Sequence, residues 1–256
     1  MQLSQDAFKS SPFPVQVLQE TDSTNNVLKR MPGAPHGTVL VTGRQTAGRG
    51  RMGRTFSSPE GGVYLSVLLK PDAPAAELLH LTPMAAVAMR RAIFDACGVL
   101  SEIKWPNDLV CTGRKLCGIL TELTQQDGAT CVIIGVGVNC NTAPEQLPTE
   151  LRSTATSLRQ ITGKEIDPNA LALAMVRRFA EMDAALLTEK AAWMAEFAAA
   201  CLTVGKQVQV VSGAERTAAV AEGIDENGAL LVRLQNGETA AISTGEVSVR
   251  GMYGYI

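Results

Sequence analysis

The stretch Gly48-Arg-Gly-Arg-Met-Gly-Arg54 places three guanidinium groups among three glycines, between apolar runs at residues 38–42 and 63–69. Arginine donates hydrogen bonds to carboxylate and phosphate oxygens, and glycine allows backbone N–H groups to approach a ligand closely. The connection from residue 43 to residue 61 is longer than most loops of compact domains, which is typical of functional loops. We therefore predict an anion-binding loop between two strands, with a solvated basic loop as the alternative for this stretch taken alone.

The composition is that of an ordinary globular protein without a global charge. The 256 residues are 46% hydrophobic, enough for one large domain or for one large and one small domain. Lys and Arg number 23 against 25 Asp and Glu, so the net charge of -2 favours neither DNA nor an anionic membrane. The first residues lack the pattern of a signal peptide, and no apolar run reaches the roughly 18 residues of a membrane span. We expect a cytoplasmic protein that binds small anions.

The cysteines and histidines argue against zinc and against a histidine-dependent nucleophile. Six cysteines occur at positions 97, 111, 117, 131, 140 and 201, without a Cys-x-x-Cys motif, and the only histidines are His36 and His80. This pattern disfavours a zinc site, a Cys/His pair and a Ser-His-Asp triad. Several of the cysteines lie in strand-like apolar runs, so we interpret them as reduced core residues.

Apolar periodicity predicts a mixed α+β fold in the first 200 residues. The expected strands are residues 15–18, 38–42, 63–69, 103–105, 116–123 and 131–138. A short helix is expected at residues 23–30, entered through Asp22 or Ser23, and a longer one with Thr82 as N-cap, Pro83 as its first residue and Gly98 as its stop. Residues 167–202 show helical spacing, and we expect these helices to cover one face of the sheet.

The last 50 residues differ in character. Short strands are expected at residues 208–211, 217–223, 230–234, 239–242 and 247–250. Asp225-Glu-Asn-Gly228 and Gln235-Asn-Gly237 are hairpin turn signals between them. We predict a small β-barrel over residues 204–256, attached to a main domain over residues 1–203.

Two polar segments stand at the beginning of the expected first helix and at the entry to the arginine loop. Ser23-Thr-Asn25 offers two hydroxyls and an amide, although such a triplet is also typical of a helix N-cap. Gln45 taken alone is an ordinary polar loop residue.

Two further segments combine polar and apolar residues more specifically. Lys104-Trp-Pro-Asn-Asp-Leu109 predicts a strand that runs into a rigid turn, where Asp108 either binds Mg²⁺ or accepts a proton, or else forms an Asx turn. In Arg114-Lys-Leu-Cys-Gly-Ile-Leu120, Lys115 enters an apolar strand and needs an anionic partner unless it is solvated. Gly135-Val-Gly-Val-Asn139 lacks the third glycine of a dinucleotide loop, so the Rossmann interpretation is weak.

Taken together and in this order, these motifs resemble those of the biotin protein ligases. The resemblance covers essentially the whole chain, including Ile242-Ser-Thr-Gly-Glu246, and the pairing of the Gly/Arg motif with Lys-Trp-Pro-Asn-Asp is highly specific. Phe56 stands where the family usually has tryptophan, and Cys117 where alanine is common. The resemblance implies a class II aminoacyl-tRNA synthetase-like catalytic fold with an SH3-like C-terminal barrel.

The resemblance also implies an activity. Members of this family activate biotin with ATP and Mg²⁺ to biotinyl-5′-adenylate and then biotinylate one lysine of a biotin carboxyl carrier domain. By similarity, the biotin site comprises Ser23, Thr24, Asn25, Gln45, Arg49, Gly50, Arg51 and Lys115. The ATP or adenylate site comprises Arg49, Arg51, Arg54, Phe56, Lys104, Asn107, Lys115 and Asn139. Lys115, Arg51 and Asp108 are the catalytic candidates, and Asp108 either contacts Mg²⁺ or orients the incoming lysine.

Two alternatives compete with this interpretation. A lipoate or octanoate ligase shares the fold, but the complete arginine/glycine motif argues against it. A non-enzymatic nucleotide- or RNA-binding module is disfavoured by the near-neutral charge and by an aromatic content of only 4%. The first expected strand begins near Val15, so we expect the ligase-only group without an N-terminal DNA-binding domain, as a monomer or a homodimer.

Overall fold

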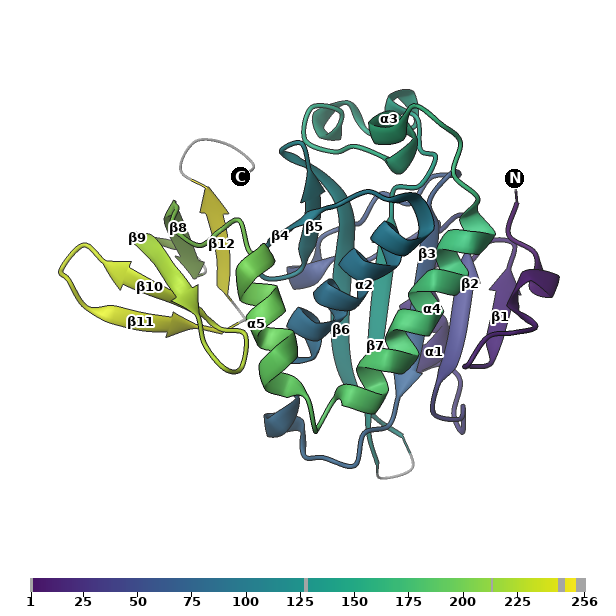
Figure 1. Ribbon diagram of the computed structural model, residues 1–256, viewed down its shortest axis with the longest axis horizontal. Helices are drawn as coiled ribbons and strands as arrows, with labels where there is room; N and C mark the ends of the chain where they lie inside the picture. Colours follow the sequence, from purple (N-terminus) through teal and green to yellow (C-terminus); the bar gives the residue numbers. More distant parts are fainter. Residues whose placement is uncertain (1, 127–128, 213, 244–246, 252–256) are drawn as a thin grey trace.

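The computed structural model describes residues 2–126, 129–212, 214–243 and 247–251. This part of the chain forms a seven-stranded sheet with helices, followed by a five-stranded sheet near the C-terminus (Figure 1). The predicted α+β class is therefore confirmed. Of the predicted C-terminal motif at residues 242–246, residues 244–246 lie outside the described residues.

The large sheet has the strand order β1-β2-β3-β7-β6-β5-β4. Its strands are β1 (Val15–Leu18), β2 (Thr38–Thr42), β3 (Val63–Leu69), β4 (Glu102–Lys104), β5 (Asp108–Cys111), β6 (Arg114–Gln126) and β7 (Ala129–Val138). Only β1 and β2 pair in parallel, and the other neighbours are antiparallel. Six of these strands match the predicted runs, whereas β5 was not predicted because turn-forming Pro106 and Asn107 directly precede it.

Helices cover both faces of this sheet unequally. They are α1 (Thr24–Lys29), α2 (Leu81–Cys97), α3 (Leu158–Thr162), α4 (Pro168–Ala185) and α5 (Lys190–Ala200). Helices α2 and α4 lie side by side over one face and enclose the main apolar core, as predicted for the second of them (Figure 1). Helix α1 lies on the other face over a smaller cluster that includes Leu28, Leu40 and Ile133. That second face is left open for a binding site.

The start of α2 differs from the prediction. The N-cap is His80 and the helix begins at Leu81, so the assignment of Thr82 as N-cap and Pro83 as first residue is wrong. The hydroxyl of Thr82 instead donates to Oγ1 of Thr121 on β6 at 2.9 Å. The predicted stop is confirmed, because Gly98 ends the helix with a left-handed φ of 70°.

Short 3₁₀ helices complete the catalogue of helical elements. They span Gln5–Phe8, Arg51–Gly53, Ala75–Leu78, Pro144–Gln146 and Thr149–Leu151.

The C-terminal sheet is antiparallel throughout, with the order β11-β10-β9-β8-β12. Its strands are β8 (Gln207–Ser212), β9 (Glu215–Ile224), β10 (Leu230–Leu234), β11 (Thr239–Ile242) and β12 (Val247–Gly251). Both predicted turns, at residues 225–228 and 235–237, connect neighbouring antiparallel strands as expected.

The small sheet packs on the large domain through a specific contact. The indole Nε1–H of buried Trp105 donates to the carbonyl oxygen of Gly228 at 3.0 Å. Beside it, Nζ of Lys190 donates to Oδ1 of Asn227 at 2.6 Å. Apolar residues of the small sheet, such as Leu230, belong to the same core cluster as α2. The two parts share a core, and a domain boundary between residues 203 and 204 stays a prediction.

Candidate functional site

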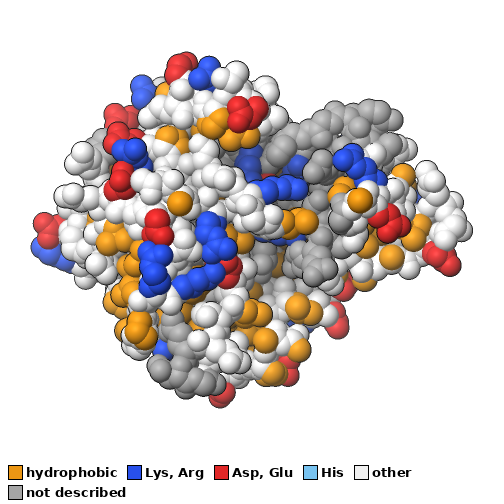
Figure 2. Space-filling view, turned by 180° about the vertical axis from the view of Figure 1, so that it is seen from behind, with side chains coloured by type: hydrophobic (Ala, Val, Ile, Leu, Met, Phe, Trp, Pro, Cys, Tyr) orange, Lys and Arg blue, Asp and Glu red, His pale blue; other side chains and the backbone are white. Residues whose placement is uncertain are grey.

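A pocket opens on the side of the large sheet opposite α2 and α4, and it collects most of the residues predicted for a site. The predicted residues that line it are Ser23, Thr24, Asn25, Gln45, Arg49, Gly50, Arg51, Arg54, Phe56, Asn107, Asp108 and Lys115. Viewed from this side, Lys and Arg side chains gather near the middle of the molecule (Figure 2). The segments come from the start of α1, the arginine loop and strands β5 to β7. The sheet order therefore brings together residues that are far apart in the sequence.

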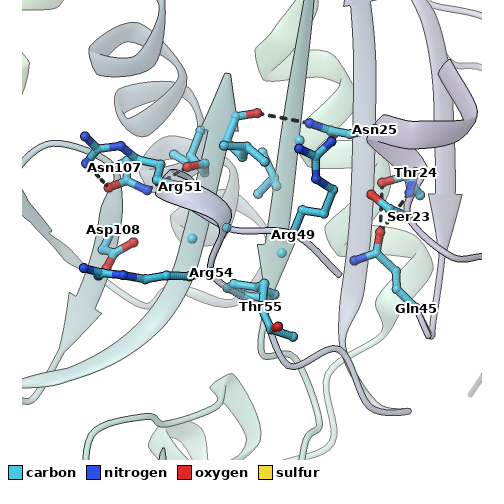
Figure 3. A pocket seen from close by; sticks show the side chains of 18 of the residues that line it. Ser23, Thr24, Asn25, Gln45, Arg49, Arg51, Arg54, Thr55, Asn107 and Asp108 are labelled. Carbon is cyan, nitrogen blue, oxygen red and sulfur yellow. Dashed lines mark hydrogen bonds between the residues drawn. The ribbon is translucent and has the colours of Figure 1, made fainter. Parts of the chain in front are cut away.

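One end of the pocket is built from uncharged polar groups at the start of α1 (Figure 3). The backbone N–H of Thr24 donates to Oε1 of Gln45 at 2.9 Å, and Nε2 of Gln45 donates to the hydroxyl of Ser58 at 3.0 Å. Ser23 is the N-cap of α1, but its side chain makes no capping hydrogen bond. The hydroxyl of this buried residue lies at the pocket wall, available for a ligand.

Asn25 lies deeper at the same end. Its Nδ2 donates to Oε2 of Glu122 at 2.9 Å, and its Oδ1 accepts from the hydroxyl of Ser66 at 2.5 Å. The space for this amide exists because residue 135 is glycine, where a Cβ would collide with the Asn25 side chain. Gly135 of the weak dinucleotide-like motif therefore has a packing function here.

Two paired glycines form the floor of the pocket. Gly118 on β6 lies opposite Gly137 on β7, and the ring of Phe56 lies over both. A Cβ at residue 118 would come within 2.7 Å of Cε2 of Phe56. Nζ of Lys115 is 5.5 Å from the centroid of the Phe56 ring, within the range of a cation–π interaction. The aromatic ring that departs from the family pattern thus joins the glycine floor to the lysine.

The other end of the pocket is charged. Nζ of Lys115 forms an ion pair of 2.7 Å with Oδ1 of Asp108, and both side chains are largely shielded from solvent. Lys115 thus has the anionic partner expected from its sequence context. Nη1 of Arg51 donates to Oδ1 of Asn107 at 3.4 Å, and Arg54 lies beside Asp108 (Figure 3). This end can neutralise a ligand with several negative oxygens.

Arg51 sits in an environment that favours an anionic ligand. Burial lowers the pKa of its guanidinium and the charge of Arg54 acts in the same direction, although Asp108 opposes them. Because arginine stays protonated in proteins, the lowered pKa means that the charge is held at a cost. Carboxylate or phosphate oxygens beside Arg51 would offset that cost.

The arginine loop folds back on itself around a short 3₁₀ helix. The N–H of Gly50 donates to the carbonyl of Arg54 at 2.7 Å, and Arg49 forms an isolated bridge with Thr55. Met52 at the tip has a left-handed φ of 55° and is 51% exposed, an unfavourable combination for a large apolar residue.

Two predicted residues are not among those that line the pocket. Asn139 is buried behind it, where its Nδ2 donates to the carbonyl of Thr156 and its N–H to that of Leu116. Lys104 lies on β4 at the edge of the sheet. Asn139 thus connects β7 to the segment before α3, which is a scaffold position.

Conversely, the structure adds groups that the sequence did not single out. Ser66 and Glu122 hydrogen-bond to the pocket residues Thr24 and Asn25 from strands β3 and β6. Both are polar residues inside apolar strand runs, at positions that alternate toward the pocket face. That alternation was the signal that could have identified them.

The described chain contains no helix that is both long enough and apolar enough to cross a membrane.

The fold and the pocket define a catalytic domain of the biotin/lipoate A/B protein ligase family, whose sequence model matches residues 17–139. A model of the biotin protein ligase C-terminal domain matches residues 203–250. Together with its relatives, these matches show that the chain belongs to the biotin protein ligase family.

The relatives cover different shares of the chain. The biotin--[acetyl-CoA-carboxylase] ligase of Paracoccus denitrificans is 34% identical over 227 residues, 85% of this chain and 93% of that protein. The bifunctional ligase/repressor BirA of Bacillus subtilis is 46% identical over 153 residues, which span 59% of this chain and 47% of that protein. The structure of a biotin protein ligase from Aquifex aeolicus in complex with biotin and ATP superimposes with a TM-score of 0.82. It is 31% identical and covers 93% of this chain and 99% of that one.

Proposed function

We propose that the pocket joins biotin to ATP and that the activated biotin is then transferred to a lysine of a biotin carboxyl carrier domain. Membership of the biotin protein ligase family supports an ATP-dependent ligase with biotin and ATP as substrates. The observation that carries the proposal is the division of one pocket into an uncharged polar end at Thr24 and Gln45 and a charged end at Lys115 and Arg51. These ends match a ureido ring and a carboxylate that meets a triphosphate.

In the first step, a carboxylate oxygen of biotin attacks the α-phosphorus of ATP. A P–O bond forms, the bond to the β-phosphate oxygen breaks, and pyrophosphate leaves with the electron pair. Two anions must approach each other, so the barrier is largely electrostatic and falls when cations are held in place beforehand. Lys115, Arg51 and Arg54 are the cations of the charged end. Arg49 lies nearer the polar end, where it contacts Asn26 and Glu122.

Lys115 is the central catalytic candidate. Its ammonium forms an ion pair of 2.7 Å with Asp108 and lies within cation–π range of the Phe56 ring. We infer that it leaves this ion pair to bridge the biotin carboxylate and the α-phosphate, since a compact ammonium can serve both oxygens. This change of partner by Lys115 keeps its positive charge in the site throughout and leaves Asp108 available for the second substrate or a metal.

The donor set fits Mg²⁺ as a partner of ATP but not as a protein-caged ion. Among the described residues there is no group of three or more His, Cys, Asp or Glu side chains that could hold a metal. Mg²⁺ commonly binds through one or two carboxylates together with phosphate oxygens and water. Asp108 is the carboxylate of the charged end, so we propose that it holds Mg²⁺ with the phosphates of ATP. When bound, the ion would neutralise phosphate charge.

In the second step, the amine of the acceptor lysine attacks the acyl carbon of biotinyl-5′-adenylate. A C–N bond forms, the C–O bond to the phosphate breaks, the amine loses its proton, and AMP leaves. We propose that Asp108 orients the amine or receives its proton once Lys115 has moved. The arginine loop, including Arg49 and Gly50, would cover the adenylate and exclude water until the carrier arrives.

The Phe56 ring above the glycine floor is proposed to bind the nucleotide. The Phe56 ring over Gly118 and Gly137 offers an apolar face near Lys115, suited to the adenine. Asn107 lies beside Arg51 and offers a further polar contact to the adenylate. Lys104 and Asn139 lie outside this set, and we assign no ligand contact to them.

Pyrophosphate exchange tests the proposal. Purified protein is incubated with radiolabelled pyrophosphate, ATP and Mg²⁺, and with biotin, lipoate or neither. Exchange into ATP that depends on biotin supports the proposal. Exchange with lipoate alone would identify a lipoate ligase, and no exchange under any condition would refute an adenylating enzyme. Cytoplasmic location and the oligomeric state, monomer or homodimer, stay predictions.

A further inference from the structure

The carboxylate of Glu122, behind the pocket, contacts three side chains at the polar end. Its Oε2 accepts from Nδ2 of Asn25 at 2.9 Å. Its Oε1 lies 2.8 Å from Nζ of Lys29 and 3.3 Å from Nη1 of Arg49. Glu122 does not line the pocket, so it acts on a ligand only through its neighbours. Its three partners come from α1 and from the arginine loop.

The contacts of Glu122 keep it ionised. Burial alone would raise the pKa of this carboxyl, but hydrogen bonds from Lys29 and Asn25 and the charge of Arg49 lower the pKa below its ordinary value. An ionised carboxylate accepts hydrogen bonds and never donates. The side chain of Asn25 must therefore turn its NH₂ group toward Glu122.

The orientation of Asn25 sets the direction of the hydrogen bonds beyond it. Both of its N–H groups are engaged, one by Glu122 and the other by the carbonyl of Leu120 at 3.4 Å. Its Oδ1 can only accept, so the hydroxyl of Ser66 donates its only proton to Asn25. In the 2.6 Å contact between Ser66 and Thr24, Thr24 must then be the donor.

The hydroxyl proton of Thr24 is thus committed inside the protein. It lies within reach of two acceptors, Oγ of Ser66 at 2.6 Å and Oε1 of Gln45 at 3.2 Å. What remains for the pocket at this position is the lone pairs of Thr24 and Asn25. A ligand that reaches them must bring N–H or O–H donors.

We propose that Glu122 is a positioning residue that fixes the direction of the hydrogen-bond chain through Asn25 and Ser66 to Thr24, and that this direction selects ligands with N–H donors. The inference deepens the proposed function and rests on it, since the N–H groups of the ureido ring of biotin are such donors. Without the negative charge, the Asn25 amide can rotate by 180°. The chain then reverses: Ser66 donates to Thr24, which loses a lone pair for the ligand, and the Thr24 proton turns to Oε1 of Gln45 or toward the ligand N–H.

The test compares Glu122→Gln with Lys29→Met. Both variants remove the ion pair between residues 29 and 122. Only the first replaces the acceptor-only carboxylate, which orients Asn25 and also pairs with Arg49, by an amide that can donate as well as accept. Lys29→Met retains the aliphatic stem, and Lys29 does not line the pocket. We expect Glu122→Gln to raise the dissociation constant of biotin by roughly 10- to 100-fold, because a buried hydrogen bond becomes mispaired. The dissociation constant of biotin for Lys29→Met should stay within about threefold of the wild-type value, because a partly exposed ion pair contributes little.

A second readout separates direction from packing. Calorimetry gives the ratio of the dissociation constants of a biotin analogue methylated on one ureido nitrogen and of biotin itself. The wild type should bind the methylated analogue more weakly than biotin. The ratio should shrink in Glu122→Gln, because the hydrogen-bond chain of this variant no longer requires an N–H donor from the ligand. If Glu122→Gln does not fold, Ser66→Ala breaks the same chain without changing charge and should weaken biotin binding in the same way.

The outcomes are distinct. Unchanged biotin affinity and an unchanged ratio in Glu122→Gln would overturn the inference, as would equal losses in Glu122→Gln and Lys29→Met, since the carboxylate would then be only a structural ion-pair partner. If Glu122→Gln is unfolded, unchanged binding in Ser66→Ala would overturn it. A wild-type protein that binds no biotin would overturn the proposed function itself, and this inference with it.

Discussion

Replacing Lys115 by alanine should stop adenylate formation while the fold stays intact. The ammonium of Lys115 is shielded by Asp108 and Phe56 and faces the pocket. A cation about 3 Å from a reacting oxygen contributes about 5 kcal/mol at an effective dielectric constant of about 20. Mutations that remove one such preorganised group from other enzymes cost about 3–4 kcal/mol. The rate of biotin-dependent pyrophosphate exchange should therefore fall by about 10²- to 10³-fold or more.

The assay needs matched controls. Lys9→Ala removes a lysine whose ion pair with Asp6 is exposed, so its exchange rate should equal that of the wild type. Lys115→Arg keeps the charge but replaces a point charge by a planar fork, and it should recover only part of the rate. Circular dichroism and urea unfolding would verify the fold of each variant. Exchange by Lys115→Ala within tenfold of the wild type would refute the role given to this lysine.

Four further predictions concern the surroundings of the site. Trp105→Phe leaves the carbonyl of Gly228 without its buried donor and should lower the free energy of unfolding by about 1–3 kcal/mol in urea; no change would show that this domain contact is not stabilising. Gly118→Ala should weaken ATP binding by about tenfold in a titration, because its Cβ displaces the Phe56 ring, and retained affinity would disprove the aromatic floor. Arg51→Gly should release biotinyl-5′-adenylate into solution about tenfold faster, which quenched-flow chromatography measures; unaltered release would contradict its retention by the arginine loop. The pKa of Glu122 is lower in the folded protein than its ordinary value of 4.5. The ionised carboxylate therefore stabilises the fold above that pH, and this stabilisation is lost as the pH falls through the folded-state pKa. Urea unfolding from pH 6 to pH 3 should therefore show a smaller acid loss in Glu122→Gln than in the wild type, and equal losses would argue against this linkage.

Local signals in the sequence predicted most of the elements, because they are short-range. The apolar runs of β2, β3 and β10 carry the strand pattern at their observed limits. Gly98 ends α2 because its backbone adopts the left-handed conformation, which glycine reaches readily. The start of α2 escaped, since Thr82 is attractive as an N-cap but its hydroxyl is engaged by Thr121 from a distant strand. A tertiary contact here overrides a local preference.

The site was predictable as a set of motifs but not as a geometry. Pairing of β6 with β7 places Gly118 opposite Gly137 and so creates the floor under Phe56, a register that no single segment encodes. The same long-range pairing places Glu122 beside α1. The sequence motifs single out Asn139 as readily as Asn107. Only the fold reveals that the side-chain amide of Asn139 hydrogen-bonds to the backbone behind the pocket. Motif order predicts the chemistry, whereas strand register decides which residues take part.

The most direct test of the central claim is to detect the activated intermediate on the enzyme. Purified protein is mixed with biotin, ATP and Mg²⁺ without any carrier protein, desalted, and analysed by mass spectrometry under native and denaturing conditions. The account predicts a non-covalent complex with the mass of biotinyl-5′-AMP, which is lost when a biotin carboxyl carrier domain is added and becomes one biotinylated lysine. A protein that retains no adenylate, or a carrier that stays unmodified, would contradict it.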